Sequence, residues 1–227
     1  MNRVHSQIVM LLVLLLGMTA NGQERQALVG GTLINGLGGS PIYDSVILIN
    51  GDVIEKVGSV DTLEVPDDYK VVSTEAMSVL PGLWDMHVHL MLTGHADYSQ
   101  WHPNYADRFA PEIMPASALQ LLLAGVTSAR DLGAPLEDTL SVKRRLEAGE
   151  IYGPRMFWSG PFIQKAPYPG TEDYRWGIEG AADARQKVRT LAQAGMDVIK
   201  LIDHDLMTIA EGKAIVAEAH KYNLPVV

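Results

Sequence analysis

The spacing of apolar and polar positions changes near residue 81, so the chain divides into two regions of different character. Before that point, short runs rich in Val, Ile and Leu are separated by Gly, Asn and Asp, which is the pattern of brief strands joined by tight turns. Two of these runs flank Gly51-Asp52 and predict a β-hairpin. We expect strands at 28–29, 32–35, 45–50, 53–58, 71–73 and 78–80. Residues 23–80 are therefore predicted to form part of a small β-sandwich or sheet.

After residue 81, apolar runs of strand length alternate with amphipathic segments of helical period. The predicted strands are 83–89, 126–131, 155–159, 197–202 and 224–227, and the predicted helices are 116–124, 136–150, 181–194 and 209–222. Thr208 with Glu211 three residues later marks the start of the last helix as a capping box. Strands that alternate with helices are typical of parallel βαβ units and of the α/β class. A (β/α)₈ barrel of the TIM type takes roughly 250 residues. We therefore expect residues 81–227 to be the first four to five units of such a barrel, and the chain to be an amino-terminal fragment.

The first 22 residues have the pattern of a secretory signal peptide. Arg3 precedes an apolar core at 8–16, and the small residues Ala20 and Gly22 stand before a cleavage point at Gln23. The core is too short to span a bilayer, although an uncleaved anchor stays the alternative. We therefore expect a secreted or periplasmic protein. The chain has no Cys, so it has neither a disulfide framework nor a thiol for lipid attachment.

Composition narrows the range of partners. The chain is 47% hydrophobic, which is typical of a globular protein of one or two domains. Its formal net charge is −9 and it has no run of basic residues, which argues against nucleic acid and against an anionic membrane surface as partners after signal cleavage. A small-molecule substrate is expected, and oligomerisation is left open.

The most informative motif lies where the two regions meet. His87 and His89 are two residues apart at the end of an apolar run, and side chains in a strand alternate between faces, so both imidazoles are expected on one face. Two neutral imidazoles on one strand can bind a divalent metal, whereas a catalytic zinc takes about three protein ligands. A surface His-x-His on an edge strand is the alternative. Asp85 shares this face, and we expect it to accept a hydrogen bond behind the ligands rather than to bind the metal itself.

Several motifs together show a family resemblance. They are GGTLING at 30–36, LPGLWDMHVH at 80–89, LAGVTSARDLG at 123–133, GPR at 153–155 and AGMDVIK at 194–200. With them the chain resembles the amino-terminal half of an amidohydrolase-superfamily enzyme, nearest to the imidazolonepropionase-like group that includes Xaa-Pro dipeptidase-like enzymes. The resemblance runs from about residue 27 to residue 227, and the Pro-Gly-x-x-Asp-x-His-x-His string is its most specific part. For residues 23–80 the resemblance favours the strands of a small β-sandwich in a composite domain.

The resemblance implies a site and a reaction. His87 and His89 would ligate one or two divalent metal ions, usually zinc. Lys200 matches a lysine that is carboxylated and bridges two metals in binuclear members, so it is the expected catalytic residue as well as a metal ligand. An ion pair between Lys200 and a neighbouring acid is the alternative. The remaining ligands, two histidines and an aspartate, would lie beyond residue 227.

The implied activity is hydrolysis of a carbon–nitrogen bond by metal-activated water. The bond would belong to a cyclic amide or imidazolone-like compound, or to a dipeptide. The lack of Cys and of a Gly-x-Ser-x-Gly motif agrees with a reaction that needs no nucleophilic side chain. The alternative is a non-catalytic binding or scaffold module, or an inactive fragment.

Other polar residues are expected near the mouth of the barrel. His95 and His102 lie in the loop after the first barrel strand, where solvated histidines are favoured over substrate contact. His204 follows the fourth strand, and for this residue solvation and substrate contact are equally open. Arg130 and Asp131 are expected to form a mutual ion pair, with binding of a substrate carboxylate by Arg130 as the alternative.

Overall fold

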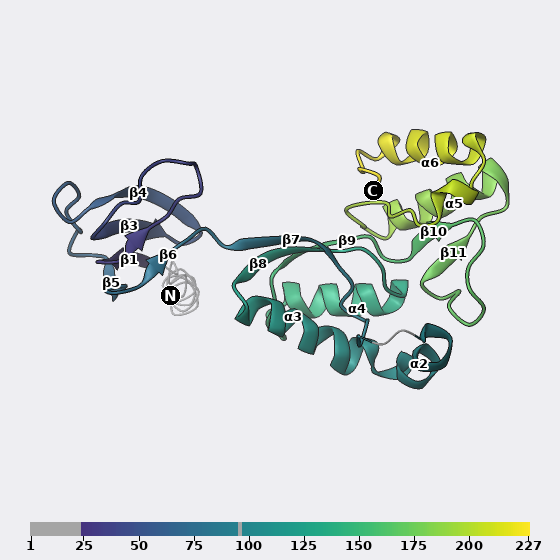
Figure 1. The fold of residues 1–227 in the computed structure, drawn as a ribbon, viewed down its shortest axis with the longest axis horizontal. Helices are drawn as coiled ribbons and strands as arrows, with labels where there is room; N and C mark the ends of the chain where they lie inside the picture. The colour runs from purple at the N-terminus through teal and green to yellow at the C-terminus, as the bar shows by residue number, and fades with distance from the viewer. Residues whose placement is uncertain (1–23, 95–96) are drawn as a thin grey trace, which may run out of the picture. The chain divides into compact units, whose positions relative to one another are not determined.

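The computed structural model of the chain describes residues 24–94 and 97–227, which form two compact units (Figure 1). The first unit runs to Pro81, and the second covers Gly82–Val227. The predicted signal peptide at 1–22 and the loop residue His95 lie outside the described residues.

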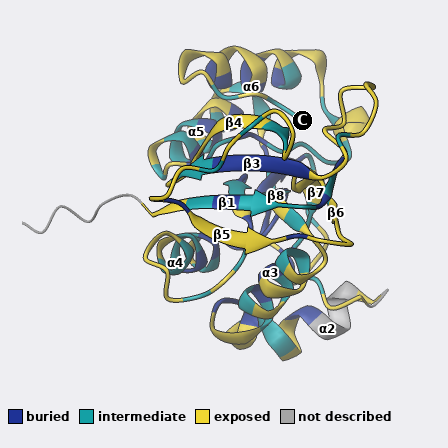
Figure 2. Ribbon diagram, turned by 90° about the vertical axis from the view of Figure 1, so that its left-hand side faces the viewer, coloured by how far each residue is buried: buried dark blue, intermediate teal, exposed yellow. Residues whose placement is uncertain are grey.

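The first unit is built on an antiparallel hairpin. Its main sheet has the order β4-β3-β1-β5. The strands are β1 (Arg25–Val29), β3 (Ser45–Asn50), β4 (Val53–Ser59) and β5 (Lys70–Ser73), and β2 (Thr32–Leu33) pairs with β6 (Ser78–Val79) in a second small sheet. The pairing of β3 with β4 confirms the predicted hairpin, and Gly51 at its turn has a φ of 62°, which favours glycine. Strand β3 is largely buried, whereas β5 is exposed (Figure 2).

The second unit has a parallel sheet in which the strands follow chain order. Strands β7 (Leu83–Val88), β8 (Val126–Asp131) and β9 (Arg155–Trp158) are neighbours in that sequence. The crossovers carry α3 (Met114–Leu123) and α4 (Leu136–Glu147), which lie on one side of the strands in Figure 1. Helices α5 (Gly180–Gln193) and α6 (Ile209–Lys221) pack side by side. The prediction of parallel βαβ units is confirmed for these strands.

The predicted strands at 197–202 and 224–227 form only isolated bridges in the structure. The reason is that residues 197–202 share their hydrogen bonds among three neighbours. Asp197 N donates to Trp158 O, the Asp197 carboxylate accepts from Trp158 N, and Leu201 N donates to Val227 O. Lys200 O accepts a hydrogen bond from Ile163 N, which belongs to a short neighbouring strand. The described residues therefore form a mixed α/β fold in which the parallel sheet does not close into a barrel.

Several short elements were not predicted. They are helix α2 (Tyr98–Tyr105), turn η1 (Ala106–Arg108), the π-helical turn η2 (Phe109–Ile113), strands β10 (Phe162–Gln164) and β11 (Arg175–Gly177), and turn η3 (His204–Leu206). Strands of three residues are too short to show a period, and α2 has Pro103 inside it, which argues against a helix on sequence grounds.

The core of the second unit holds these elements together. Trp158, Ile163, Leu191, Ile199 and Ile215 are each no more than 2% exposed and belong to one cluster. The cluster therefore joins β9, β10, α5, α6 and the segment that precedes Lys200, and this fixes the position of that lysine.

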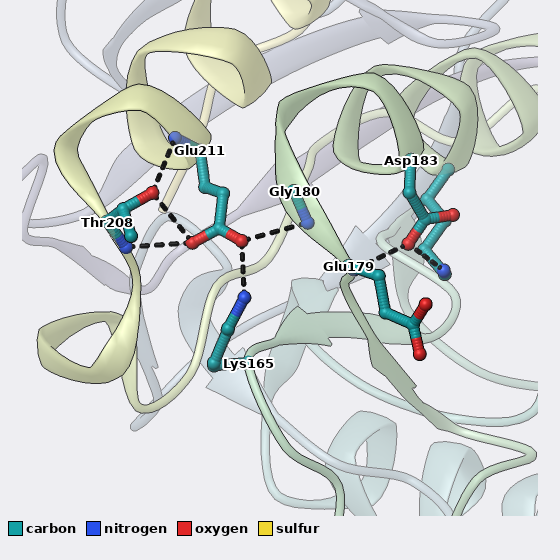
Figure 3. Close-up of polar contacts among 7 residues, drawn as sticks. Lys165, Glu179, Gly180, Asp183, Thr208 and Glu211 are labelled. Carbon is teal, nitrogen blue, oxygen red and sulfur yellow. Dashed lines mark hydrogen bonds and ion pairs between the residues drawn. The ribbon is translucent and has the colours of Figure 1, made fainter.

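The start of α6 is fastened to the rest of the unit through one buried carboxylate (Figure 3). Thr208 and Glu211 form the predicted capping box, which is confirmed. The Glu211 carboxylate also accepts hydrogen bonds from Lys165 Nζ and from Gly180 N at the start of α5. The hydrogen bond from Lys165, followed by those from Thr208, lowers the pKa of Glu211 to about 2.

Among the residues that the structure describes, none of the helices combines the length and the apolar character needed to cross a membrane.

Candidate metal centre

The two histidines of the motif lie close together at the end of β7. Their ring centroids are 5.2 Å apart and the rings meet edge to face at 63°. The side chain of His87 is exposed, whereas His89 is partly buried and its ring lies 6.3 Å from that of Phe162. The period-two spacing therefore places both imidazoles on the same side of the strand, as the sequence predicted.

The surroundings of both rings favour the neutral imidazole. Burial, and then the neighbouring His87, lower the pKa of His89 to about 4. The Gly133 backbone lies close to this ring and acts in the opposite direction, although its geometry falls outside that of a hydrogen bond. Burial and the positive charges of Lys200 and Arg130 lower the pKa of His87. Both rings are therefore neutral at pH 7, which is the form that binds a metal ion.

Lys200 is brought to the two histidines by the fold. Its backbone is held beside β10, because Ile163 N donates to Lys200 O, and the ring of the adjacent Phe162 lies 6.3 Å from that of His89. The charge of Lys200 also contributes to the lowered pKa of both His87 and His89. Burial, and then the charge of Arg130, lower the pKa of Lys200 itself. Lys200 makes no ion pair with any acid in the described part of the chain, so the alternative of a simple ion pair is not seen.

Two neighbouring contacts hold the histidine strand in place. Asp85 Oδ1 accepts a hydrogen bond of 3.0 Å from the His87 backbone N–H. Arg130 Nε donates to Met86 O at 2.9 Å, so this arginine ties β8 to β7 through the backbone. Asp85 thus contacts the backbone of the motif, as expected of a residue behind the ligands.

The predicted ion pair between Arg130 and Asp131 is wrong. Successive side chains in β8 point to opposite faces, so Arg130 is directed to β7 while Asp131 is only 2% exposed. The Asp131 carboxylate accepts a hydrogen bond of 3.1 Å from Gly133 N. Burial raises its pKa to about 7, and the nearby Gly133 and Leu90 backbones act in the opposite direction. Asp131 therefore holds the backbone of Gly133, which lies beside the His89 ring.

The expectation of a solvated His102 is also wrong. Its side chain is 6% exposed, and its Nε2 lies 2.7 Å from Asp173 Oδ2. Its ring centroid is 5.1 Å from that of Phe109 and 4.7 Å from that of Tyr174. The unpredicted helix α2 carries His102 into this position, whereas His204 in η3 is exposed.

Arg175 is a residue near the site that the sequence did not single out. It lies on β11 and lines a cavity of about 320 Å³ that His89 also lines. The aromatic residues on both sides of it, Tyr174 and Trp176, could have drawn attention to this stretch. The pairing of β11 with β10, which brings it to His89 by way of Phe162, has no counterpart in the sequence pattern.

The residues present fit part of a metal site. Within 24–94 and 97–227, no group of three or more His, Cys, Asp or Glu side chains could hold a metal ion. The described residues offer two neutral imidazoles, with the buried and unpartnered Nδ1 of His89 among their nitrogens. Lys200 is beside them, and as a carbamate it would add oxygen ligands. The donors are suited to zinc, and further ligands would be needed to complete the coordination.

A parallel α/β unit with a His-x-His motif at the end of its first strand is the arrangement expected of a metal-dependent hydrolase, and the comparisons with known proteins identify the family. Residues 78–227 match the model of the amidohydrolase family. The chain belongs to the amidohydrolase family. None of the curated proteins matches the chain.

Solved structures show the same fold over about half of their length. A molinate hydrolase matches with a TM-score of 0.74 and 22% identity, over 90% of this chain and 53% of its own. Phenylurea hydrolase B matches with a TM-score of 0.76 and 21% identity, over 89% and 54%. A Xaa-Pro dipeptidase with methionine bound in its active site matches with a TM-score of 0.71 and 21% identity, over 89% and 56%. The chain thus spans about half the length of the solved chains that it matches.

Proposed function

We propose that the protein is a metal-dependent hydrolase of a carbon–nitrogen bond in a small molecule, either a cyclic amide or a dipeptide. In this proposal residues 81–227 are the first four to five units of a (β/α)₈ barrel, which the rest of a longer chain would close. Export by the predicted signal peptide, to the periplasm or the medium, is part of the same proposal.

One observation carries the proposal most directly. The rings of His87 and His89 are 5.2 Å apart at the end of β7, and the pKa of each is lowered. Active sites of (β/α)₈ barrels lie at the carboxyl ends of the strands, which is where this pair lies. The names of the structurally similar proteins, a molinate hydrolase, a phenylurea hydrolase and a Xaa-Pro dipeptidase, support a reaction of this class.

The chain's own residues have defined tasks in this scheme. His87 and His89 would each supply a neutral nitrogen to the metal. Lys200 has a lowered pKa, so a larger fraction is free amine, which can add carbon dioxide and lose a proton to give a carbamate. Arg130 would hold the backbone of Met86, just before the histidines, and Asp131 would hold that of Gly133 beside His89. When bound, the metal supplies an activated water and polarises the substrate carbonyl.

A second candidate, a binding or scaffold module without catalysis, is favoured by a different observation. The described residues contain no group of three or more metal-binding side chains of the His, Cys, Asp and Glu types. A module of this kind would bind zinc weakly and would hydrolyse nothing.

The test is metal content together with hydrolysis, measured on the full product of the gene. The protein is loaded with zinc and assayed against a panel of dipeptides and cyclic amides, beside His87→Ala and His89→Ala. We expect hydrolysis in the unmodified protein, with loss of both bound zinc and turnover in the two variants. His220→Ala is the matched control, because His220 is exposed on α6 and should leave both readings unchanged. Full zinc content and activity in His87→Ala would refute the proposal.

A further inference from the structure

Arg175 is a buried cation without an acidic partner. Its exposed fraction is 7%, and it forms no ion pair with any acid that the structure describes. Nη1 donates a hydrogen bond of 3.2 Å to the neutral Gln164, and Nε is buried without a partner among the described residues. An unpaired charge is costly to bury, so a guanidinium kept in this state points to a missing anion.

Aromatic rings surround the guanidinium and hold it in place. Its central carbon lies 4.5 Å from the ring centroid of Tyr168, 4.9 Å from that of Phe162 and 5.2 Å from that of Tyr174. Ring faces attract a cation, but each contributes less than a hydrogen-bonded carboxylate does. The rings therefore orient the guanidinium but do not neutralise its charge.

The cavity beside Arg175 reaches the candidate metal centre. Its volume is about 320 Å³, and it is lined by His89 and Arg175, with Met91, Leu92, Phe162 and Ile202 among the apolar residues. This volume suits a small organic molecule. No acidic side chain lines the cavity among the described residues, so nothing there neutralises Arg175.

We infer that Arg175 binds a carboxylate of the substrate, and that the substrate joins this carboxylate to an apolar group that fills the cavity between Arg175 and His89. The inference rests on the proposed function, because it takes the reacting bond to lie at the His89 end. Arg175 would then determine specificity, by favouring acids over the corresponding neutral amides. Its planar guanidinium can bind a carboxylate through two parallel hydrogen bonds.

The other cations near the histidines are less suited to this task. The Nε of Arg130 already donates a hydrogen bond to Met86 O, and Arg130 does not line the cavity. Lys200 does not line the cavity either, and the proposed function assigns it to the metal. Arg175 is therefore the residue with both access to the cavity and free donor atoms.

The test measures binding, so it does not depend on turnover. Calorimetric titrations of the full gene product use 3-phenylpropanoate and its neutral counterpart 3-phenylpropanamide, with zinc-loaded and with chelator-treated protein. We expect the acid to bind at least about 30-fold more tightly than the amide, even without metal, because Arg175 supplies the charge. Arg175→Met should abolish this preference and Arg175→Lys should keep part of it. Arg185→Met, at an exposed position on α5, should leave it unchanged.

The inference would be overturned if the two compounds bound with equal affinity, or if neither bound. It would also be overturned if the preference for the acid survived Arg175→Met, or if that preference needed zinc. Thermal melts check that the variants fold, and if Arg175→Met does not, the comparison of acid with amide in the unmodified protein still decides. A failure of the proposed function looks different: zinc uptake and hydrolysis would be absent while the Arg175-dependent preference for the acid persists.

Discussion

The buried carboxyl of Asp131 should make the stability of the protein depend on pH in a direction opposite to that of most aspartates. The perturbation is Asp131→Asn, which keeps the shape of the side chain and an oxygen that accepts from Gly133 N. Asp131 is 2% exposed, and burial raises its pKa from 3.8 to about 7. Between these two values the unfolded chain has released the proton while the folded chain still holds it. The contribution of Asp131 to stability therefore falls as the pH rises through this range and is constant above it.

The difference between the two pKa values sets the magnitude. It corresponds to roughly 4 kcal/mol of folding free energy, lost between about pH 4 and pH 7. The amide of the variant does not titrate, so its stability relative to the unmodified protein should rise by up to that amount over the same range.

The assay is urea unfolding followed by tryptophan fluorescence, at several pH values from 4 to 8 and with a chelator present. Asp183→Asn is a control of opposite sign, because the hydrogen bond from Lys187 lowers the pKa of Asp183. That variant should lose stability relative to the unmodified protein as the pH rises. A stability difference between Asp131→Asn and the unmodified protein that stays constant across the pH range would show that the pKa of Asp131 is not raised in the folded protein.

Three further predictions follow from single contacts. Thr208→Ala should lower the free energy of unfolding by about 1 kcal/mol through loss of the cap on α6, and Thr208→Ser should restore most of it in the same urea titration. Because the pKa of Glu211 is lowered to about 2, its contribution to stability should be lost as the pH falls from about 4.5 towards 2, and Glu211→Gln should flatten this acid limb in thermal melts. Gly133→Ala would place a Cβ atom 2.5 Å from the Phe162 ring and 3.1 Å from His89 Nδ1. It should weaken zinc binding by roughly 10- to 100-fold in a competition titration while the circular dichroism spectrum is kept; unchanged affinity would contradict this.

The long periodic segments could be predicted from the sequence, because their own apolar pattern specifies them. The predicted strand at 126–131 agrees with β8, and the predicted helix at 209–222 differs from α6 by one residue. The predicted strand at 197–202 failed for a tertiary reason, because β9, β10 and the 224–227 segment share its hydrogen bonds. Only a packed structure determines which of these neighbours takes each backbone group.

The candidate site was likewise predictable only where the local sequence pattern determines it. The shared face of His87 and His89 follows from the period of a strand. Alternation of faces also argues against pairing Arg130 with Asp131, so that error was avoidable from the sequence. The burial of Arg175 could not be predicted, because it depends on contacts between segments that are distant along the chain.

The metal centre is tested most directly by a crystal structure of the zinc-loaded full gene product, with anomalous data collected on both sides of the zinc absorption edge. We expect a zinc peak about 2.0–2.1 Å from a ring nitrogen of both His87 and His89, with carbamate density on the Nζ of Lys200. Absence of zinc from this pair of histidines, or zinc held elsewhere while both rings stay unliganded, would contradict this expectation.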